Sequence, residues 1–483
     1  MRGRLITLGA VVCVLAASAA LAACGSKAGG TATSPNAASA SPAAQTSGGG
    51  TAPSAPPNGT SGGQGGTPPS GGGGTPPSGS GTPGGSTAKY TATGAYTLSG
   101  GSASKASASY KAGVADQSGV LATESAHLTL TSPTVSTSGD SKSLDESSFY
   151  GLNAGVLAKS GAKITISGGT VSTTGTGANG VFAYGSGSSI TISNATIKAT
   201  AQGGHGAMAS GGGSVTLKNV DIHTAGANSA PLATDRGGGT ITASGGTIVS
   251  SGTDSPGIYS TGAISVSGAQ IKATGSEAVV IEGSNSVTLT DTSLSASRKS
   301  GVMIYQSMSG DARGAKGTFT MTGGSLSAAD GPLFYVTNST GVVSVKGATL
   351  TAASGTLIKA AAGNWGTKGS NGGTVRFTAD AEKLRGDVVA DKVSSVSLTL
   401  KNGSALTGKI SKAALTLDSA STWTVTADSV LTSLSDAGDI SGTSITNIIG
   451  NGHDVTYDAS LAANSALGGK TYTLVNGGHL LPN

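Results

Sequence analysis

Short apolar stretches recur along the chain from residue 89 onwards. Segments such as "ITISGGTV" from Ile164, "ITISNATI" from Ile190 and "VTLKNVDI" from Val215 alternate apolar and polar residues, pass through a Gly or Asn turn, and end on a second short alternation. Alternation with a period of two is typical of a β-strand that buries one face. Each such segment therefore predicts two short strands joined by a tight turn.

A second set of rows lies between these strand pairs. The rows "NAGVLAK", "NGVFAYG", "HGAMASG" and "SPGIYST" begin with a small or polar residue and have an apolar residue at the fourth position. That position predicts a column of stacked interior side chains: Val120, Val156, Phe182, Met208, Leu232, Ile258, Val280, Met303, Phe334 and Leu357. Most rows are about 23–26 residues apart, the length of one coil with three short strands, and no helical stretch interrupts them.

The repeats predict an all-β fold, a parallel β-helix of about twelve coils over residues 89–435. With 81 glycines, 11% charged and 4% aromatic residues, the composition suits many turns around a thin core. Longer gaps at 138–150, 308–316 and 363–373 predict loops that bulge from the coils. The period shortens after Val375, which predicts narrower coils, and we expect residues 436–483 to cap the open end of the stack.

The first residues have the pattern of a secretory signal. Positive charge in "MRGR" precedes an apolar stretch that ends in Leu21-Ala22-Ala23-Cys24. This ending resembles a bacterial lipobox, with Cys24 as the lipidated residue; the alternative is an ordinary secretory signal that happens to contain a cysteine. The sequence thus predicts a lipoprotein signal peptide at 1–23, a lipid anchor in the cell membrane, and a mature chain exposed at the cell surface.

Residues 24–88 consist almost entirely of Gly, Ser, Thr, Pro and Ala, with no charged residue between Lys27 and Lys89. Nothing in this segment can pack, so it predicts a disordered linker that holds the repeats away from the membrane. Cleavage before Cys24 removes two arginines, and the formal net charge falls from +5 to +3 (5 − 2 = 3). The basic residues are dispersed, so we do not expect nucleic-acid binding.

The periodicity over residues 90–435 resembles the right-handed parallel β-helix proteins of the pectin-lyase-like superfamily. The segments "SSFYGLNAGVLA", "SPGIYSTG", "GTFTMTGG" and "LDSASTWTV" look like those of secreted bacterial β-helix proteins. The resemblance implies a right-handed coil, an extracellular setting and carbohydrate as the commonest ligand class. It does not imply an activity, because one fold hosts many chemistries.

His205 lies in "GGHG", and a GHG tripeptide can be catalytic in hydrolases of that family. Family hydrolases with this segment also carry Asn-Thr-Asp, Asp-Asp and Arg-Ile-Lys segments, and this sequence has none of the three. Glycosidases need converging carboxylates, whereas the acidic residues here are scattered over the coils. His205 also takes the first position of its row, where other rows have Asn, Ser or Glu, so we expect a turn residue and no catalytic residue.

Polar and aromatic residues follow the apolar column, at the positions where strand meets turn. The candidate ligand-binding residues there are Tyr184, Asp235, Arg236, Glu282 and Tyr305. Glu282 and Tyr305 are in neighbouring rows, about 5 Å apart if the strands pair. Aromatic faces stack on sugar rings, and charged groups hydrogen-bond hydroxyls or uronates. The alternative is a solvated turn with one Asp–Arg pair. Tyr259 and Tyr335 lie one position earlier in their rows, and the sequence leaves open whether they bind a ligand or pack against neighbours.

The segment 138–151 concentrates Asp140, Asp145 and Glu146. These oxygen ligands make it a candidate calcium site, although the spacing does not match a known calcium loop. No other metal or cofactor is expected.

These features together predict a membrane-anchored, extracellular β-helix that acts as a non-catalytic binding or adhesion module. Polysaccharide or another cell-surface component is the expected ligand. Two alternatives stay open: a polysaccharide lyase or glycoside hydrolase with an unrecognised site, and a structural spacer of the cell envelope.

Overall fold

The computed structural model describes residues 91–436 and 438–483. The predicted signal peptide at 1–23, Cys24 and the linker at 24–88 lie outside these residues and stay predictions. Strands dominate the described part, which has one α-helix, α1 (Leu144–Tyr150), and one short 3-10 helix, η1 (Ala462–Leu467). No helix of the described part is long and apolar enough to cross a membrane.

The strands form three sheets, which we name A, B and C in the order in which each coil passes through them. Sheet A contains β1 (Thr93–Ser99), β4 (Gln117–Thr123), β7 (Val156–Lys159), β10 (Val181–Tyr184), β13 (Ala207–Ser210), β16 (Leu232–Thr234), β19 (Ile258–Ser260), β22 (Val279–Glu282), β25 (Val302–Tyr305), β28 (Phe334–Thr337), β31 (Thr356–Ala360) and β34 (Asp387–Ala390). Sheet C contains β3 (Ser109–Ala112), β6 (Thr134–Thr137), β9 (Thr170–Thr173), β12 (Thr196–Ala199), β15 (Asp221–Thr224), β18 (Thr247–Ser250), β21 (Gln270–Ala273), β24 (Ser293–Ala296), β27 (Ser325–Ala328) and β30 (Thr349–Ala352).

Sheet B is the longest of the three and continues to the C-terminus. Its members are β2 (Ser102–Ala106), β5 (His127–Thr131), β8 (Lys163–Ser167), β11 (Ser189–Ser193), β14 (Gly213–Lys218), β17 (Gly239–Ser244), β20 (Ala263–Ser267), β23 (Ser286–Thr290), β26 (Lys316–Thr322), β29 (Ser339–Lys346), β32 (Gly373–Asp380), β33 (Lys383–Arg385), β35 (Ser395–Lys401), β36 (Ala405–Thr407), β37 (Ala413–Leu417), β38 (Thr422–Thr424), β39 (Ser429–Asp436), β40 (Ile440–Ser441), β41 (Ser444–Ile449), β42 (Val455–Tyr457), β43 (Tyr472–Val475) and β44 (His479–Pro482).

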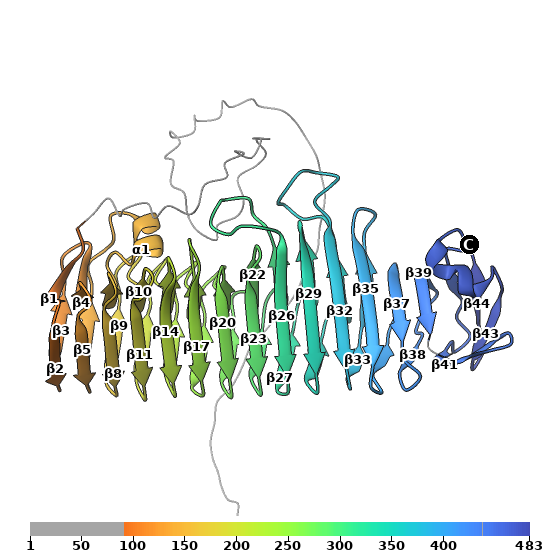
Figure 1. Ribbon diagram of the computed structural model, residues 1–483, viewed down its shortest axis with the longest axis horizontal. Coiled ribbons are helices and arrows are strands. Elements are labelled where there is room, and N and C mark those ends of the chain that lie inside the picture. The colour runs from red at the N-terminus through yellow and green to blue at the C-terminus, as the bar shows by residue number, and fades with distance from the viewer. Residues whose placement is uncertain (1–90, 437) are drawn as a thin grey trace, which may run out of the picture. The chain divides into compact units, whose positions relative to one another are not determined.

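Up to β39, each strand pairs in parallel with its counterpart in the neighbouring coil, which confirms the predicted parallel β-helix (Figure 1). The register is regular: in sheet B, Thr165 of β8 pairs with Thr191 of β11, which pairs with Thr216 of β14. Sheet A has 12 strands, in agreement with the predicted number of coils. Because like residues stack on like, alternate positions form an outward column of hydroxyls and an inward column of aliphatic side chains.

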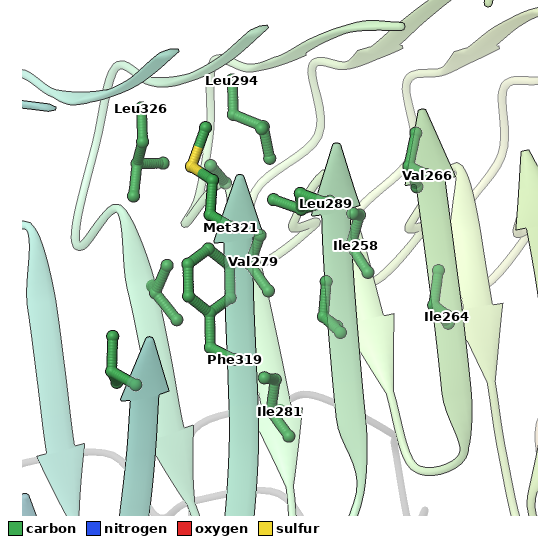
Figure 2. Close-up of a cluster of buried hydrophobic side chains, with 14 of the residues drawn as sticks. Ile258, Ile264, Val266, Val279, Ile281, Leu289, Leu294, Phe319, Met321 and Leu326 are labelled. Carbon is green, nitrogen blue, oxygen red and sulfur yellow. The ribbon is translucent and has the colours of Figure 1, made fainter. Parts of the chain in front are cut away.

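The inward columns fill the coil with one continuous hydrophobic core. Figure 2 shows its middle part, where Phe319 and Met321 of β26 lie among the aliphatic side chains of neighbouring coils. Phe334 contacts Phe319 on one side and Phe377 on the other, with ring centroids 5.9 and 5.1 Å apart. Each coil contributes inward side chains from all three sheets and buries them against the coils on either side, so the stability of each coil depends on its two neighbours.

The predicted interior column of sheet A is wrong by one residue in several coils. Strand register places Val181 and Ala207 in line with Val156, and Val279 and Val302 in line with Ile258. Phe182, Met208, Val280 and Met303 therefore point to the opposite face of the sheet, where they form separate apolar clusters. The error has a physical cause, because both faces of sheet A are buried at these coils. The sequence therefore lacks the apolar–polar alternation that shows, in other strands, which residues point inwards.

The turns between sheets B and C have the expected Gly/Asn chemistry. Asn194 and Asn219 adopt φ values of 52° and 49°, the left-handed region that asparagine tolerates better than most residues. The same turn uses Gly245 in the next coil, with a φ of 63°. A tight turn at the same place in each coil keeps the strands of sheets B and C in register.

The last coils are narrower, as predicted. Leu398 of β35 pairs with Leu415 of β37, only 17 residues later (415 − 398). Parallel stacking then continues through β42 and β44, and β40–β41 and β43–β44 add two antiparallel pairs at the end of the chain. Residues 438–483 thus extend the stack before closing it with strands that run back on themselves.

The corrected register makes Ala207 an interior residue, and we predict that Ala207→Leu destabilises the protein by about 1–3 kcal/mol. The larger side chain has no room at a position with 0% exposure between Val181 and Leu232. Urea denaturation measures the effect, with Ala263→Leu at an exposed strand position as the control. Wild-type stability of Ala207→Leu would show that this position faces away from the core.

Candidate functional site

The outer face of sheet A carries buried apolar and aromatic side chains, unlike the polar outer faces of sheets B and C. In its first half, Leu157, Phe182 and Met208 are fully buried beneath α1 and the segment that follows it. Gly151 ends α1 with a φ of 78°, and a Cβ atom there would lie 2.7 Å from Leu157 and 2.8 Å from Phe182. The Ser210 hydroxyl also donates a hydrogen bond of 2.6 Å to the Phe149 carbonyl. This half of the face is therefore closed.

The second half of the face carries four aromatic residues, which we name the aromatic cluster: Tyr259, Tyr305, Tyr335 and Trp365. They surround Val280 and Met303, each only 6% exposed. Tyr305 and Trp365 are in contact, with ring centroids 4.7 Å apart. Tyr259, Tyr335 and Trp365 remain partly exposed around this buried apolar pair.

Trp365 comes from the loop between β31 and β32, one of the loops expected to bulge from the coils. Asn371 holds this loop, because its side-chain amide donates to the Trp365 carbonyl at 2.8 Å and to the Gly363 carbonyl at 2.9 Å. Figure 1 shows this loop and the one before β26 rising on the upper side of the stack. The indole therefore has a defined place beside Tyr305.

Glu282 lies behind the aromatic cluster and is 1% exposed. Its Oε2 accepts hydrogen bonds from the Tyr259 hydroxyl at 2.6 Å and the Tyr305 hydroxyl at 2.8 Å. Its Oε1 accepts from the Ser307 hydroxyl and from the Ser307 backbone N–H at 3.3 Å. A buried carboxylate with four donors is well satisfied, so Glu282 fixes the orientation of two tyrosines.

The electrostatics of Tyr259 and Tyr305 agree with this role. Burial raises the pKa of each hydroxyl well above its ordinary value, and the neighbouring Glu282 carboxylate raises each pKa further. Both tyrosines thus stay neutral hydrogen-bond donors over the physiological pH range.

Arg236 connects the two halves of the face. Its guanidinium lies 3.7 Å from the centroid of the Phe149 ring on α1, and its Nη2 forms an ion pair of 2.7 Å with Asp311. Asp311 accepts from Ser309 at 2.9 Å, and Ser309 accepts from Ser307 at 2.8 Å. The Ser307 hydroxyl has one proton, which it donates either to Ser309 or to Glu282, so Ser307 lies between the polar contacts of Arg236 and those of Glu282.

The sequence-predicted candidates divide into two places. Glu282 and Tyr305 are direct neighbours in the register of β22 and β25, as the row alignment predicted. Asp235 is 1% exposed and accepts from the Arg236 backbone N–H at 2.6 Å, so it supports the turn that carries Arg236. Tyr184 is separate from this group and packs edge-on against Tyr150 of α1, with centroids 5.4 Å apart.

Sequence reasoning missed Trp365 and Ser307 and left Tyr259 and Tyr335 undecided between binding and packing. Trp365 and Ser307 lie in loops, where no coil-to-coil alignment applies. A tryptophan in a Gly-rich insertion was the one available signal, because such loops rarely contain a large apolar residue without a contact for it.

The structure does not bring the candidate calcium ligands together. Asp140 accepts from the Thr176 backbone N–H at 2.7 Å, whereas Asp145 and Glu146 lie in the first turn of α1. Acidic residues are favourable there because they face the positive end of the helix dipole. Among residues 91–436 and 438–483, no three His, Cys, Asp or Glu side chains group closely enough to hold a metal ion.

His205 lies in a ladder of polar side chains at the entries to the sheet A strands. The His205 backbone N–H donates to Asn179 Oδ1 at 3.0 Å, and His205 Nδ1 accepts from the Ala230 N–H at 3.0 Å. Ser255 accepts from the Ser229 N–H in the same manner, at 2.9 Å. These side chains satisfy backbone donors that the tight turns leave unpaired, which is the turn role that the sequence predicted.

Burial lowers the pKa of His205 to about 4, and this shift predicts a pH dependence of stability. In the unfolded chain the His205 imidazole binds a proton near pH 6.5, whereas in the folded chain it does so only near pH 4. The free energy of unfolding therefore falls as the pH drops from about 6.5 to about 4. Relative to His205→Asn, the wild type should lose roughly 3 kcal/mol over this range. Urea midpoints at each pH measure the difference, and His223→Asn, at an exposed position of β15, should keep the wild-type slope.

We further predict that Glu282→Gln lowers the free energy of unfolding by about 2–3 kcal/mol. The amide replaces one acceptor oxygen by a donor that faces other donors, so hydrogen bonds from Tyr259 and Tyr305, or from Ser307, are lost. Urea denaturation of the variant tests this. An unchanged unfolding free energy would contradict a structural role for the carboxylate.

Residues 118–310 match the family model described as the right-handed β-helix region. No curated protein matches the chain. The match begins in β4 and ends in the loop that follows β25, so it spans the regular three-sheet coils. The repeats of this chain form a right-handed parallel β-helix, and residues 118–310 are similar to the right-handed β-helix family.

Proposed function

We propose that this protein is a lipid-anchored, extracellular binding module that recognises a polysaccharide or another cell-surface glycan through the aromatic cluster on sheet A. The observation that carries the proposal is the set of three partly exposed rings, Tyr259, Tyr335 and Trp365, around the buried apolar pair. Sugar rings present apolar C–H faces and polar edges. Aromatic side chains with a polar atom are suited to both.

Polar groups beside the rings supply hydrogen-bonding partners. The Lys359 ammonium lies 5.5 Å from the centroid of the Tyr335 ring, and the Lys359 side chain is exposed. A cation at this position can donate to hydroxyl or carboxylate oxygens of a sugar whose face lies on the ring. The cluster thus combines an apolar surface with a directional donor, as most small-ligand sites do.

The rigidity of the cluster also favours binding. Glu282 orients Tyr259 and Tyr305, and Asn371 holds the loop of Trp365. Side chains that are already ordered lose less conformational entropy when a ligand binds, so a preformed surface gains affinity.

The geometry favours recognition over acid–base catalysis. A general acid or base must reach the bond that reacts, and glycoside hydrolysis uses two carboxylates on either side of that bond. Glu282 is 1% exposed and has both oxygens engaged by neighbouring donors. Its place in this proposal is that of a positioning residue for the tyrosines.

The anchor is inferred from the sequence. The apolar stretch, the lipobox-like ending at Cys24 and the Gly/Ser/Pro/Thr linker at 24–88 together support a module held away from a membrane. Such a tether would let one face of the β-helix meet an extended polymer.

Affinity electrophoresis of the full chain in gels that contain xylan, polygalacturonate or laminarin tests the proposal, with chitin and peptidoglycan pull-downs for insoluble polymers. We expect retention on at least one polymer, and we expect Trp365→Ala and Tyr335→Ala to weaken it by about tenfold or more, the loss typical of a central aromatic contact. Leu461→Ala removes a large apolar side chain that is 40% exposed in the C-terminal region, and it should bind as the wild type does.

Two results would count against this function. If no polymer retains the wild type, carbohydrate recognition is wrong. If the chain releases reducing sugars or unsaturated uronides from any of these polymers, and Glu282→Gln abolishes that activity without unfolding the protein, the protein is an enzyme.

A further inference from the structure

The N-terminal end of the β-helix is an open edge. Its first coil consists of β1, β2 and β3, and each of these strands pairs in parallel with a strand of the second coil, β4, β5 and β6. Within residues 91–436 and 438–483, no strand pairs with the opposite edge of β1 or β3. Figure 1 shows this coil at one end of the stack and the antiparallel C-terminal strands at the other.

The apolar interior of the first coil is incompletely covered. Tyr96, Leu98 and Ala103 are in register with core residues of the second coil that are at most 1% exposed, but all three remain partly exposed. The Tyr110 hydroxyl of the same layer is buried and has no hydrogen-bond partner among the described residues. The end of a repeat protein normally needs a cap over such a layer. The first coil has none in the described part of the chain.

β1 is the edge best suited to pair with another strand. Its seven residues, Thr93–Ser99, include no charged residue and no proline. β2 and β3 each contain a lysine, and Lys105 of β2 is in register with the core residue Leu130. Charged residues, above all those that point inwards, and prolines are the usual protection of an edge strand against pairing. β1 has neither, so its edge is open to another strand.

The free edge of β1 also presents backbone hydrogen-bonding groups. The Gly100 N–H, directly after β1, donates to the Thr123 carbonyl at 3.1 Å and so points towards β4. Backbone N–H groups alternate between the two edges of a strand, so those of Ala95, Thr97 and Ser99 point away from β4. Such a row of donors and acceptors is complementary to the same row on a strand that runs in the opposite direction.

The N-terminal segment of the chain has the wrong composition for a cap. Residues 25–88 contain no Val, Ile, Leu, Met or aromatic residue, and they contain ten of the 15 prolines. Apolar side chains are needed to cover Tyr96 and Leu98, and proline has no N–H for a β ladder. The C-terminal end of another copy does not match either, because its coils are narrower and its last strands already pair with each other. The edge that matches is β1 of a second copy.

We propose that two copies of this protein associate end to end through antiparallel pairing of their β1 strands. A half-turn about an axis perpendicular to sheet A reverses the direction of the strands and keeps the apolar face of β1 towards the interior. Sheet A then continues from one copy into the other, and Tyr96 and Leu98 of each copy lie against the end of the other core. Because both copies use the same edge, the interface closes at two copies and leaves no free β1 edge for a third.

The dimer has a consequence for ligand binding, which rests on the proposed function. The half-turn places the outer faces of the two A sheets on the same side. β25, which carries Tyr305 of the aromatic cluster, is the ninth strand of sheet A and lies about 40 Å from β1 at the usual strand spacing. The two clusters are then about 80 Å apart on one continuous face. A long polymer that contacts both clusters binds more tightly than it binds a single copy.

Sedimentation velocity of the full chain in detergent, over a wide range of protein concentrations, tests the association. We expect the wild type to form a dimer and Thr97→Pro to remain a monomer. The Thr97 N–H points away from β4 and its side chain is exposed, so proline removes a donor of the free edge and no bond to β4. Thr97→Lys should prevent association as well, because it places like charges side by side across the interface. Thr97→Val keeps the N–H and should behave as the wild type.

Hydrogen exchange of the β1 amides gives an independent readout. The N–H groups of Ala95 and Ser99 should exchange more slowly in the wild type than in Thr97→Lys, and their protection should increase with protein concentration. A wild type that stays monomeric at all concentrations would overturn the proposal, and so would assemblies that both Thr97→Pro and Thr97→Lys leave intact. These measurements contain no polysaccharide, so they give the same answer whether or not the aromatic cluster binds a glycan.

Discussion

The in-register backbone hydrogen bonding between successive coils is the constraint on which the rest of the structure depends. It repeats every position at the strand spacing of about 4.8 Å, so residues some 23 apart in the chain become direct neighbours. Glu282 reaches both Tyr259 and Tyr305 only because β19, β22 and β25 are consecutive strands of sheet A. The same register that stacks aliphatic side chains inside the coil thus assembles polar and aromatic groups on its outer face.

The sequence predicts sheets B and C well and sheet A less well, for a physical reason. Strands such as "ITIS" have one buried and one hydrated face, so alternation reveals their phase. In sheet A, Phe182 and Met208 face the helix α1, whereas Val181 and Ala207 face the core. All four residues are apolar, so the sequence does not show which of them point inwards. The row alignment predicted that Glu282 and Tyr305 are neighbours. It could not place Trp365 and Ser307, because these residues lie in insertions that have no counterpart in the next coil.

Polar residues that resemble catalytic machinery have structural roles in this fold. His205, Asn179 and Ser255 accept backbone N–H groups that the tight turns cannot pair. Glu282 likewise accepts hydrogen bonds from two tyrosine hydroxyls and from Ser307 of the following loop. A solenoid creates the same unpaired donors in every coil, so buried acceptors recur along it for stability alone. A functional role for any one of them therefore requires exposure or an unsatisfied atom, and Glu282, 1% exposed with both carboxylate oxygens engaged, has neither.

The outer face of sheet A becomes distinctive where insertions break the equivalence of the coils. The segment with α1 covers one half, and the loops before β26 and β32 border the other, with Arg236 held between Phe149 of α1 and Asp311 of the first loop. Surface loops are usually mobile, but these insertions contact Arg236 and the aromatic cluster, and these contacts hold them in place. The other half carries the partly exposed rings of Tyr259, Tyr335 and Trp365 around buried Val280 and Met303. The regular coils repeat short polar side chains with scattered charges such as Lys198 and Lys272, so the large rings that distinguish this face depend on the irregular segments.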